Sequence, residues 1–203
     1  MLFNNNFVLA SSSSSRYNIL KKNKLSFFKK KPTCNENTLK KNMIKLGIKH
    51  KKISLELARL KAKSVSIKIN DKLIVGSDTV ISFDGRLLNK AKNLKDAKKK
   101  IKILSGKKHN IYSSASVFYN MKEVWKTTQK STVEIRELNT KEIEKYLSKT
   151  GKKILGSVGC YQVEALGPSI IKDIKGDLFN VMGFPLFPFL KFLKKYVIKK
   201  QND

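Results

Sequence analysis

The sequence predicts an α/β fold in which helices flank a mixed central sheet. Segments typical of strands and helices alternate in the first half of the chain, whereas strand-like segments follow one another in the middle. The 203 residues are 40% hydrophobic and 9% aromatic, which is typical of a folded globular protein. A chain of this length is expected to form one large domain or two small lobes.

The chain begins with a short apolar strand, Phe7–Ala10, that leads into five serines. A helix is predicted to begin near Arg16, directly after these serines. N–H groups at a helix N-terminus and nearby hydroxyls can bind an anion, and Arg16 could neutralise its charge. The alternative is that the serines form a plain linker.

The central strand is predicted over Leu73–Phe83 and carries an acidic residue, Asp78, at its middle. An unpaired charge in a buried strand costs several kcal/mol, so Asp78 is expected to serve a metal, a proton or a buried partner. Gly76 would let another group approach the backbone closely. The alternative is a solvated aspartate at a strand end or bulge.

The remaining elements follow from periodicity and from helix caps. Helices are predicted over 53–69, over 94–104 with Asn93 as N-cap and Gly106 as stop, after a capping box at 139–142, and over 186–198 after Pro185. Further strands are predicted over 25–28, 109–119, 124–128, 132–138 and 169–174.

The formal charge of +29 allows two interpretations. It could mark a nucleic-acid-binding protein. However, only four of the 44 basic residues are arginine, the forty lysines are spread along the whole chain, and asparagine occurs sixteen times, as a genome-wide composition bias would also produce. In either case the charge should attract anionic substrates.

The two cysteines, Cys34 and Cys160, lie far apart without metal-ligand spacing, which fits a reducing cytoplasm. The sequence shows no apolar run of membrane-spanning length and no secretory signal, so neither a membrane nor export is expected. His50 and His109 are expected to be exposed or structural, and Cys160 has no evident histidine partner. Nucleophilic Cys or Ser-His catalysis is therefore not favoured.

Carboxylates are scarce, and six of the fifteen stand in apolar or glycine-containing settings: Glu36, Asp78, Asp84, Glu164, Asp173 and Asp177. Mg²⁺ takes one or two carboxylates and completes its shell with water and substrate phosphates. Asp78 with Glu36 or Glu164 could supply such a site. A polyphosphate could be held by Arg16 and the serine loop together with two lysines, Lys61 and Lys90.

Eight short motifs occur in order between Phe7 and about Tyr196. They are LASSSSSR from Leu9, NE at 35–36, LARLKA at 57–62, GSDT at 76–79, LNKA at 88–91, LSG at 104–106 with His109, VGCYQVE at 158–164 and GFPL at 183–186. With these motifs the chain resembles the Maf (septum-formation) proteins, which are nucleoside triphosphate pyrophosphatases. Any one of the motifs is a weak signal, whereas eight in order are a specific one.

The resemblance implies one Maf-like domain over residues 1–200, with two lobes, a substrate groove between them and a loose tail at 201–203. It implies a divalent metal, Mg²⁺ or Mn²⁺, and hydrolysis of a nucleoside triphosphate to monophosphate and pyrophosphate, which could clear noncanonical nucleotides. A link to cell division and a homodimer are open. By position Asp78 would be the general base and a metal ligand with Glu36, and the substrate would meet the other matched residues: Ser11, Ser13, Arg16, Lys61, Lys90 and Glu164.

The chain departs from the family pattern at four positions: Ser14 and Ala91 replace prolines, Asn35 an aspartate and Ala165 a glycine. The change at Asn35 removes a carboxylate beside the predicted metal ligand Glu36. Glu164 stands where members that act on pyrimidine triphosphates have glutamine and members that resemble 7-methyl-GTP enzymes have glutamate, so base preference stays open. Two rival functions remain: a catalytically silent basic protein that binds nucleic acid or a division partner, and a nucleotide hydrolase that releases orthophosphate.

Overall fold

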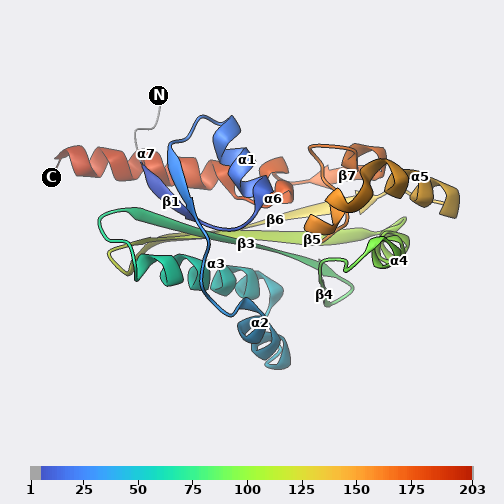
Figure 1. The fold of residues 1–203 in the computed structure, drawn as a ribbon, viewed down its shortest axis with the longest axis horizontal. Helices are drawn as coiled ribbons and strands as arrows, with labels where there is room; N and C mark the ends of the chain where they lie inside the picture. The colour runs from blue at the N-terminus through green and yellow to red at the C-terminus, as the bar shows by residue number, and fades with distance from the viewer. Residues whose placement is uncertain (1–5, 203) are drawn as a thin grey trace. The chain divides into compact units, whose positions relative to one another are not determined.

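The computed structural model describes the backbone of residues 6–202 and the side chains of residues 6–196. It shows an α/β fold with a mixed seven-stranded sheet (Figure 1), whose strand order is β2-β1-β3-β5-β6-β7 with β4 paired to β3. β1 (Phe7–Ala10) runs parallel to both β2 (Phe27–Lys30) and β3 (Leu73–Phe83). β4 (Arg86–Leu88) runs antiparallel to β3. The predicted fold class is confirmed.

The chain divides into two compact units. The first comprises residues 1–79, 113–129 and 183–203, and the second comprises residues 80–112 and 130–182. β3, β5 (Lys108–Tyr119) and β6 (Lys122–Ile135) each contribute residues to both units.

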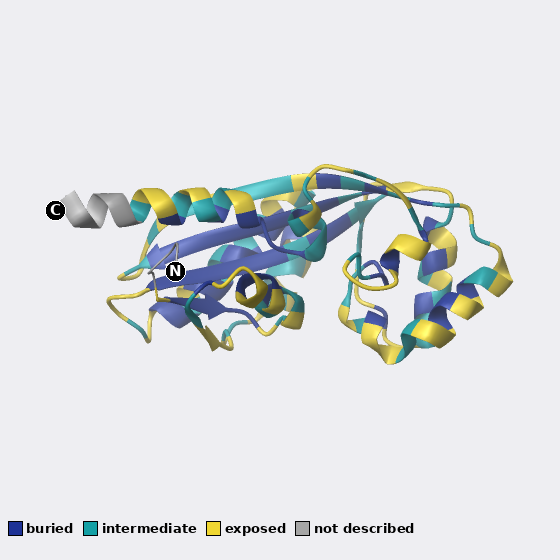
Figure 2. Cartoon of the chain, turned by 90° about the horizontal axis from the view of Figure 1, so that it is seen from above, coloured by how far each residue is buried: buried dark blue, intermediate teal, exposed yellow. Residues whose placement is uncertain are grey.

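In the first unit, helices cover both faces of the sheet (Figure 1). Side chains alternate between the two faces along a strand. Val8 and Ala10 of β1 accordingly pack with Ala62 of α3 (His50–Ser66). On the opposite face, the ring of Phe7 lies 5.2 Å from that of Phe189 in α7 (Leu186–Asn202). All four residues of β1 are therefore buried (Figure 2).

α7 is further held to the sheet by aromatic contacts. Trp125 of β6 stacks on Phe192 of α7 with ring centroids 5.0 Å apart, and Phe184, just before α7, packs edge-on against Phe189 at 5.3 Å. α7 begins at Leu186, after Pro185, as the sequence predicts, and it continues through 201 and 202, where the sequence predicts a loose tail; Asp203 lies outside the described residues.

The second unit has an apolar core of its own. β7 (Ile171–Lys175) pairs antiparallel with β6, and α4 (Leu94–Leu104) and α5 (Thr140–Thr150) pack on this core. Both predicted helix starts are confirmed: Asn93 accepts the N–H of Asp96 at 2.8 Å, and Asn139 forms a capping box with Glu142. The unit also contains the short elements η1 (Gly151–Gly156), η2 (Gly167–Ser169) and α6 (Leu178–Met182).

Several predicted boundaries were wrong. The helix predicted over 53–69 is α3, which spans His50–Ser66 and therefore begins and ends three residues earlier. The two strands predicted over 124–128 and 132–138 are the single strand β6, because its polar middle finds partners: Ser131 donates to the carbonyl of Asp177 at 3.0 Å. β2 begins two residues later than predicted, and β7 follows η2 instead of beginning at Ser169. No element was assigned to the segment that forms α2 (Glu36–Lys45).

His109 and Tyr161 form a buried polar pair in the second unit. Nε2 of His109 lies 2.6 Å from the hydroxyl oxygen of Tyr161, and His109 is only 2% exposed. Burial lowers the pKa of His109 from 6.5 to about 4, because the charged ring would lose its hydration. This environment agrees with a structural role for His109.

We expect His109→Gln to remove part of the acid sensitivity of the fold. The folded protein keeps His109 neutral down to about pH 4, whereas the unfolded chain takes up this proton below about pH 6.5. The wild type should therefore lose about 2–3 kcal/mol of unfolding free energy from this group between neutral pH and about pH 4.5. Glutamine does not titrate, so the variant should lack this loss.

Urea unfolding at the two pH values measures the effect of His109→Gln. His50→Gln is the comparison, since it removes the other histidine of the chain, which is half-buried. Burial, together with the charge of Lys40, also lowers the pKa of His50, so His50→Gln should change the pH dependence in the same direction but by less than His109→Gln. An unchanged pH dependence in His109→Gln, or the same change in His50→Gln, would contradict the assignment to His109.

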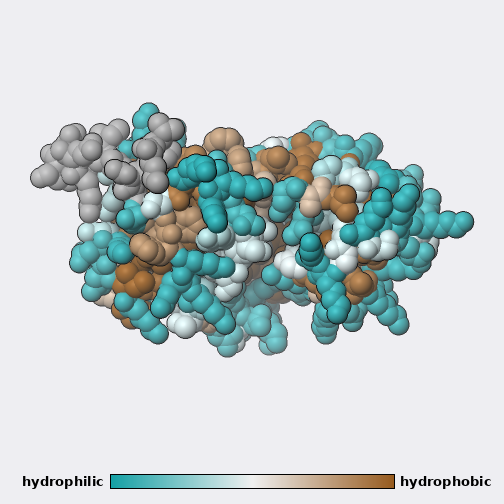
Figure 3. All heavy atoms as spheres, turned by 45° about the horizontal axis from the view of Figure 1, so that its top comes forward, coloured by the Kyte–Doolittle hydropathy of each residue, from teal (hydrophilic) through white to brown (hydrophobic). Residues whose placement is uncertain are grey.

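Hydrophilic residues are spread among apolar ones on the face shown in Figure 3 and are not gathered into one patch. This distribution matches the spacing of the lysines along the sequence. Among residues 6–202, no helix has both the length and the apolar composition that a membrane crossing requires.

Candidate active site

Three elements of the first unit bring Asp78, Lys61 and Glu36 together. Asp78 lies on β3, Lys61 on α3 and Glu36 at the start of α2. Nζ of Lys61 is 2.6 Å from Oδ1 of Asp78 and 2.8 Å from Oε2 of Glu36. The side chains of Lys61 and Asp78 are 8% and 11% exposed, whereas that of Glu36 is 41% exposed. We call these three residues the carboxylate–lysine cluster.

Small residues allow α3 to lie directly on β3. A Cβ atom added to Gly76 would lie 2.2 Å from the carbonyl oxygen of Ala58 and 2.5 Å from the nitrogen of Ala62. The close approach predicted at Gly76 is therefore that of α3. Asp78 is two residues from Gly76 on the same strand face, and Lys61 is three residues from Ala58 on the same helix face. The spacing of these residues thus aims Lys61 at Asp78.

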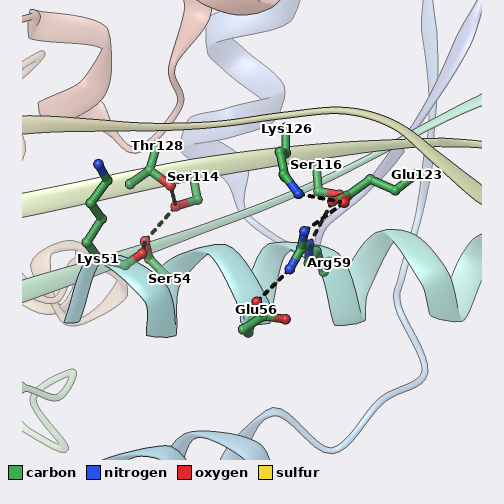
Figure 4. Close-up of polar contacts among 9 residues, drawn as sticks. All are labelled: Lys51, Ser54, Glu56, Arg59, Ser114, Ser116, Glu123, Lys126 and Thr128. Atoms are coloured by element: carbon green, nitrogen blue, oxygen red, sulfur yellow. Dashed lines mark hydrogen bonds and ion pairs between the residues drawn. The ribbon is translucent and has the colours of Figure 1, made fainter. Parts of the chain in front are cut away.

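Polar contacts fix α3 against β5 and β6 (Figure 4). Arg59 donates from Nε and Nη2 to the two carboxylate oxygens of Glu123, each at 2.8 Å. Ser116 donates to the same carboxylate at 2.8 Å. Nearer the N-terminus of α3, the hydroxyl of Ser54 lies 2.5 Å from that of Ser114. A two-bond pairing of guanidinium and carboxylate is rigid, so it limits rotation and sliding of the helix that carries Lys61.

We expect Glu123→Gln to lower the free energy of unfolding by about 1 kcal/mol, because the charged two-bond pairing with Arg59 is lost at a partly exposed site. Glu56→Gln is the matched control, since Glu56 meets only Nη1 of Arg59, at 2.6 Å. Urea unfolding of both variants tests this prediction. A loss in Glu56→Gln equal to or larger than that in Glu123→Gln would contradict it.

Asn35, one of the departures from the family pattern, is the N-cap of α2. Its Oδ1 accepts the N–H of Thr38 at 3.1 Å, a role that aspartate performs equally well. The substitution therefore removes a charge but keeps the cap that places Glu36 in the first turn. This cap and the acidic first turn were the signals from which α2 could have been predicted.

α2 also brings Lys40 near the cluster. Burial lowers the pKa of Lys40, while the negative charges of Asp78 and Glu36 act in the opposite direction. Lys40 was not among the predicted site residues. Its spacing of four residues from Glu36 on a helix was the signal that could have found it.

Arg16 is held on the opposite side of β3 from Lys61, because adjacent residues of a strand point to opposite faces. It donates from Nε to the carbonyl of Gly183 at 2.9 Å and from Nη2 to Oγ1 of Thr79 at 3.0 Å. Burial lowers the pKa of Arg16, and the charges of Asp78 and Glu36 offset part of that effect. Thr79 was missed as a site residue, although it follows Asp78 in the GSDT motif.

The serine loop closes on Arg16. Ser11 accepts the N–H of Ser13 at 3.2 Å and a bond from Nη1 of Arg16 at 3.3 Å. Ser13 is the N-cap of α1 (Ser14–Lys22) and accepts the backbone N–H of Arg16 at 3.4 Å. The structure therefore brings Ser11, Ser13 and Arg16 together, and the loop is a helix cap instead of a linker.

Lys90 and Glu164 are both exposed and belong to the second unit. Their place in the site stays a prediction. In the first unit, an open depression of about 640 Å³ is lined by residues 33–37 and so adjoins the carboxylate–lysine cluster at Glu36.

The cluster can be compared with the needs of a divalent metal. Across the described part of the chain, no three His, Cys, Asp or Glu side chains gather as a metal-ligand group. Asp78 and Glu36 converge on one point, since both contact the same nitrogen atom. Two carboxylates suffice for Mg²⁺ or Mn²⁺ where water and substrate phosphates complete the shell, so this donor set fits such an ion.

Comparison with known proteins places this geometry in context. Residues 6–196 match the sequence model of a family described as Maf-like protein. The chain is 35% identical to a 7-methyl-GTP pyrophosphatase of Bartonella henselae over 191 residues, which cover 94% of this chain and 96% of the relative. It is 30% identical to a nucleoside triphosphate pyrophosphatase of Pelagibacter ubique, over 92% of this chain and 96% of the relative. A nucleoside triphosphate pyrophosphatase of Caulobacter vibrioides is 31% identical, over 92% of this chain and 93% of the relative.

Proposed function

Because the chain belongs to the Maf family, we propose that it hydrolyses nucleoside triphosphates to nucleoside monophosphates and pyrophosphate. The observation that carries this proposal is the buried carboxylate of Asp78, held 2.6 Å from Nζ of Lys61. A carboxylate in this setting is suited to orient or deprotonate a water molecule beside a charged substrate.

The reaction adds water across the α–β phosphoanhydride, and pyrophosphate leaves. Such a reaction depends on an aligned water and on neutralised phosphate charge more than on covalent chemistry. Asp78 acts as the general base, and Asp78 with Glu36 would hold Mg²⁺ or Mn²⁺, which would supply further charge neutralisation at the phosphates. Lys61 contributes positive charge from the opposite side of β3 to Arg16.

Arg16 has a different character from the lysines. Three bonds already tie its guanidinium to Gly183, Ser11 and Thr79. A guanidinium has five N–H donors, and we propose that the two not used in these bonds meet a phosphate oxygen. Arg16 therefore acts as a fixed positive charge, with Ser11 and Ser13 shaping the loop around it.

The base is selected in the second unit, where we place Lys90 at the phosphates and Glu164 at the base. The glutamate side chain is a hydrogen-bond acceptor, so a base that offers donors is favoured over one that offers acceptors. Of the three relatives described above, one is named for 7-methyl-GTP and two for nucleoside triphosphates in general. Clearance of modified or noncanonical nucleotides is the role that fits this range.

The biological setting is a separate part of the proposal. Cys34 and Cys160 are both free thiols, which fits action in a reducing cytoplasm. From the resemblance to the Maf proteins, the proposal also includes assembly as a homodimer and a role in cell division.

A product assay tests the proposed reaction. The protein is incubated with Mg²⁺ and a panel of nucleoside triphosphates that includes 7-methyl-GTP, and the products are separated. We expect monophosphate and pyrophosphate in equal amounts, and the panel ranks the bases. Diphosphate and orthophosphate would show a different nucleotide hydrolase. Absence of turnover, together with salt-sensitive nucleic-acid binding that survives Asp78→Asn, would favour a basic binding protein.

A further inference from the structure

The ammonium of Lys61 lies between the two carboxylates that are the proposed metal ligands. Its Nζ contacts Oδ1 of Asp78 at 2.6 Å and Oε2 of Glu36 at 2.8 Å. On the basis of the proposed function, we propose that Lys61 is an internal counter-ion, which holds the two carboxylates together and which a divalent cation must displace in order to bind them.

The electrostatics of the cluster require a cation between the carboxylates. Two carboxylates that face one point repel each other, and the side chain of Asp78 is only 11% exposed, so water screens its charge poorly. Lys61 offsets one of these two negative charges in the free protein. A divalent cation would satisfy the same two carboxylates more fully, but it cannot share the space with an ammonium that it repels. The two cations therefore compete.

The side chains on the two sides of β3 differ in their freedom to move. Arg16 is tied by its three hydrogen bonds and stays in place. Lys61 is held through its Nζ atom by the two carboxylates. Its flexible four-carbon side chain can change conformation once a divalent cation binds these carboxylates. The displaced ammonium is then free to meet a phosphate of the substrate. Metal binding and phosphate binding are in this way coupled through one side chain.

Manganese binding without nucleotide tests the competition. Free Mn²⁺ is measured by electron paramagnetic resonance for the wild type, Lys61→Gln and the control Lys63→Gln. Lys63 lies on the same helix but is exposed. Its replacement therefore removes an equal positive charge from α3, but at a position outside the carboxylate–lysine cluster. We expect Lys61→Gln to bind Mn²⁺ at least about tenfold more tightly than the wild type, because the competing ion pair is gone. Lys63→Gln should stay within about twofold of the wild type.

A second measurement uses the wild-type chain and does not depend on whether Lys61→Gln folds. The ¹⁵Nζ resonance of Lys61, assigned by its absence in Lys61→Arg, should shift when Mg²⁺ is added without nucleotide. An Mn²⁺ affinity of Lys61→Gln equal to or weaker than that of the wild type would overturn the proposal, as would an unmoved Lys61 resonance or the absence of Mn²⁺ binding by all forms. Neither measurement involves turnover, so a failure of the pyrophosphatase assay is distinguished from a failure of this inference.

Discussion

Replacing Asp78 by asparagine is expected to lower the rate of pyrophosphate release by about 10²–10⁴-fold, the usual contribution of a general base. Asparagine has nearly the same shape, but its amide cannot take a proton from water and carries no charge. The variant would also leave Lys61 with Glu36 as its single anionic partner in the carboxylate–lysine cluster. The product assay with Mg²⁺, run at saturating nucleotide, measures this loss as a fall in kcat.

Asp84→Asn is the matched control for Asp78→Asn. Asp84 is exposed in the turn between β3 and β4 with φ of 49°, a backbone conformation that asparagine also tolerates. The Asp84→Asn variant makes the same chemical change six residues away from Asp78 and should keep the wild-type rate. Equal activity of Asp78→Asn and the wild type would rule out Asp78 as the base and leave the carboxylate with a purely structural role.

The sequence was most informative where a residue type conflicts with its surroundings. Asp78 was selected because a carboxylate interrupts an apolar run, and the structure shows it buried and paired instead of solvated. Gly76 was selected for the same kind of reason, and the predicted close approach is real. The helix caps at Asn93 and Asn139 could also be predicted from the sequence, because a cap is formed by residues that lie close together in the chain.

Contacts between distant residues could not be derived in the same way. Lys61 is one of forty lysines, and the LARLKA motif selected it as a substrate-binding residue. Its contact with Asp78, however, exists only because α3 packs on β3. The bond between Arg16 and Gly183 joins residues 167 positions apart. α2 was missed because only Met43 among its residues is buried, so its apolar periodicity is weak. Its position depends on tertiary contacts with α3, which include the pair of Glu36 with Lys61.

Replacing Gly76 by alanine is expected to lower the free energy of unfolding by about 3 kcal/mol or more. The added Cβ would lie 2.2 Å from the carbonyl oxygen of Ala58 and 2.5 Å from the nitrogen of Ala62. Both are backbone atoms of α3, so no side chain can turn away to make room. The helix itself must move off the sheet, and Lys61 moves with it. We therefore expect the fraction that stays folded to lose activity as well as stability.

Gly156→Ala is the control for Gly76→Ala, because a Cβ at Gly156 meets no atom within 4 Å. It should change the unfolding free energy by less than about 0.5 kcal/mol. Urea unfolding gives the stability of both variants, and the product assay at low temperature gives the activity of the folded fraction. Wild-type stability in Gly76→Ala would mean that α3 does not lie against β3 at this distance. Because Asp78 and Lys61 meet only where these two elements touch, that result would also remove the structural basis for the carboxylate–lysine cluster.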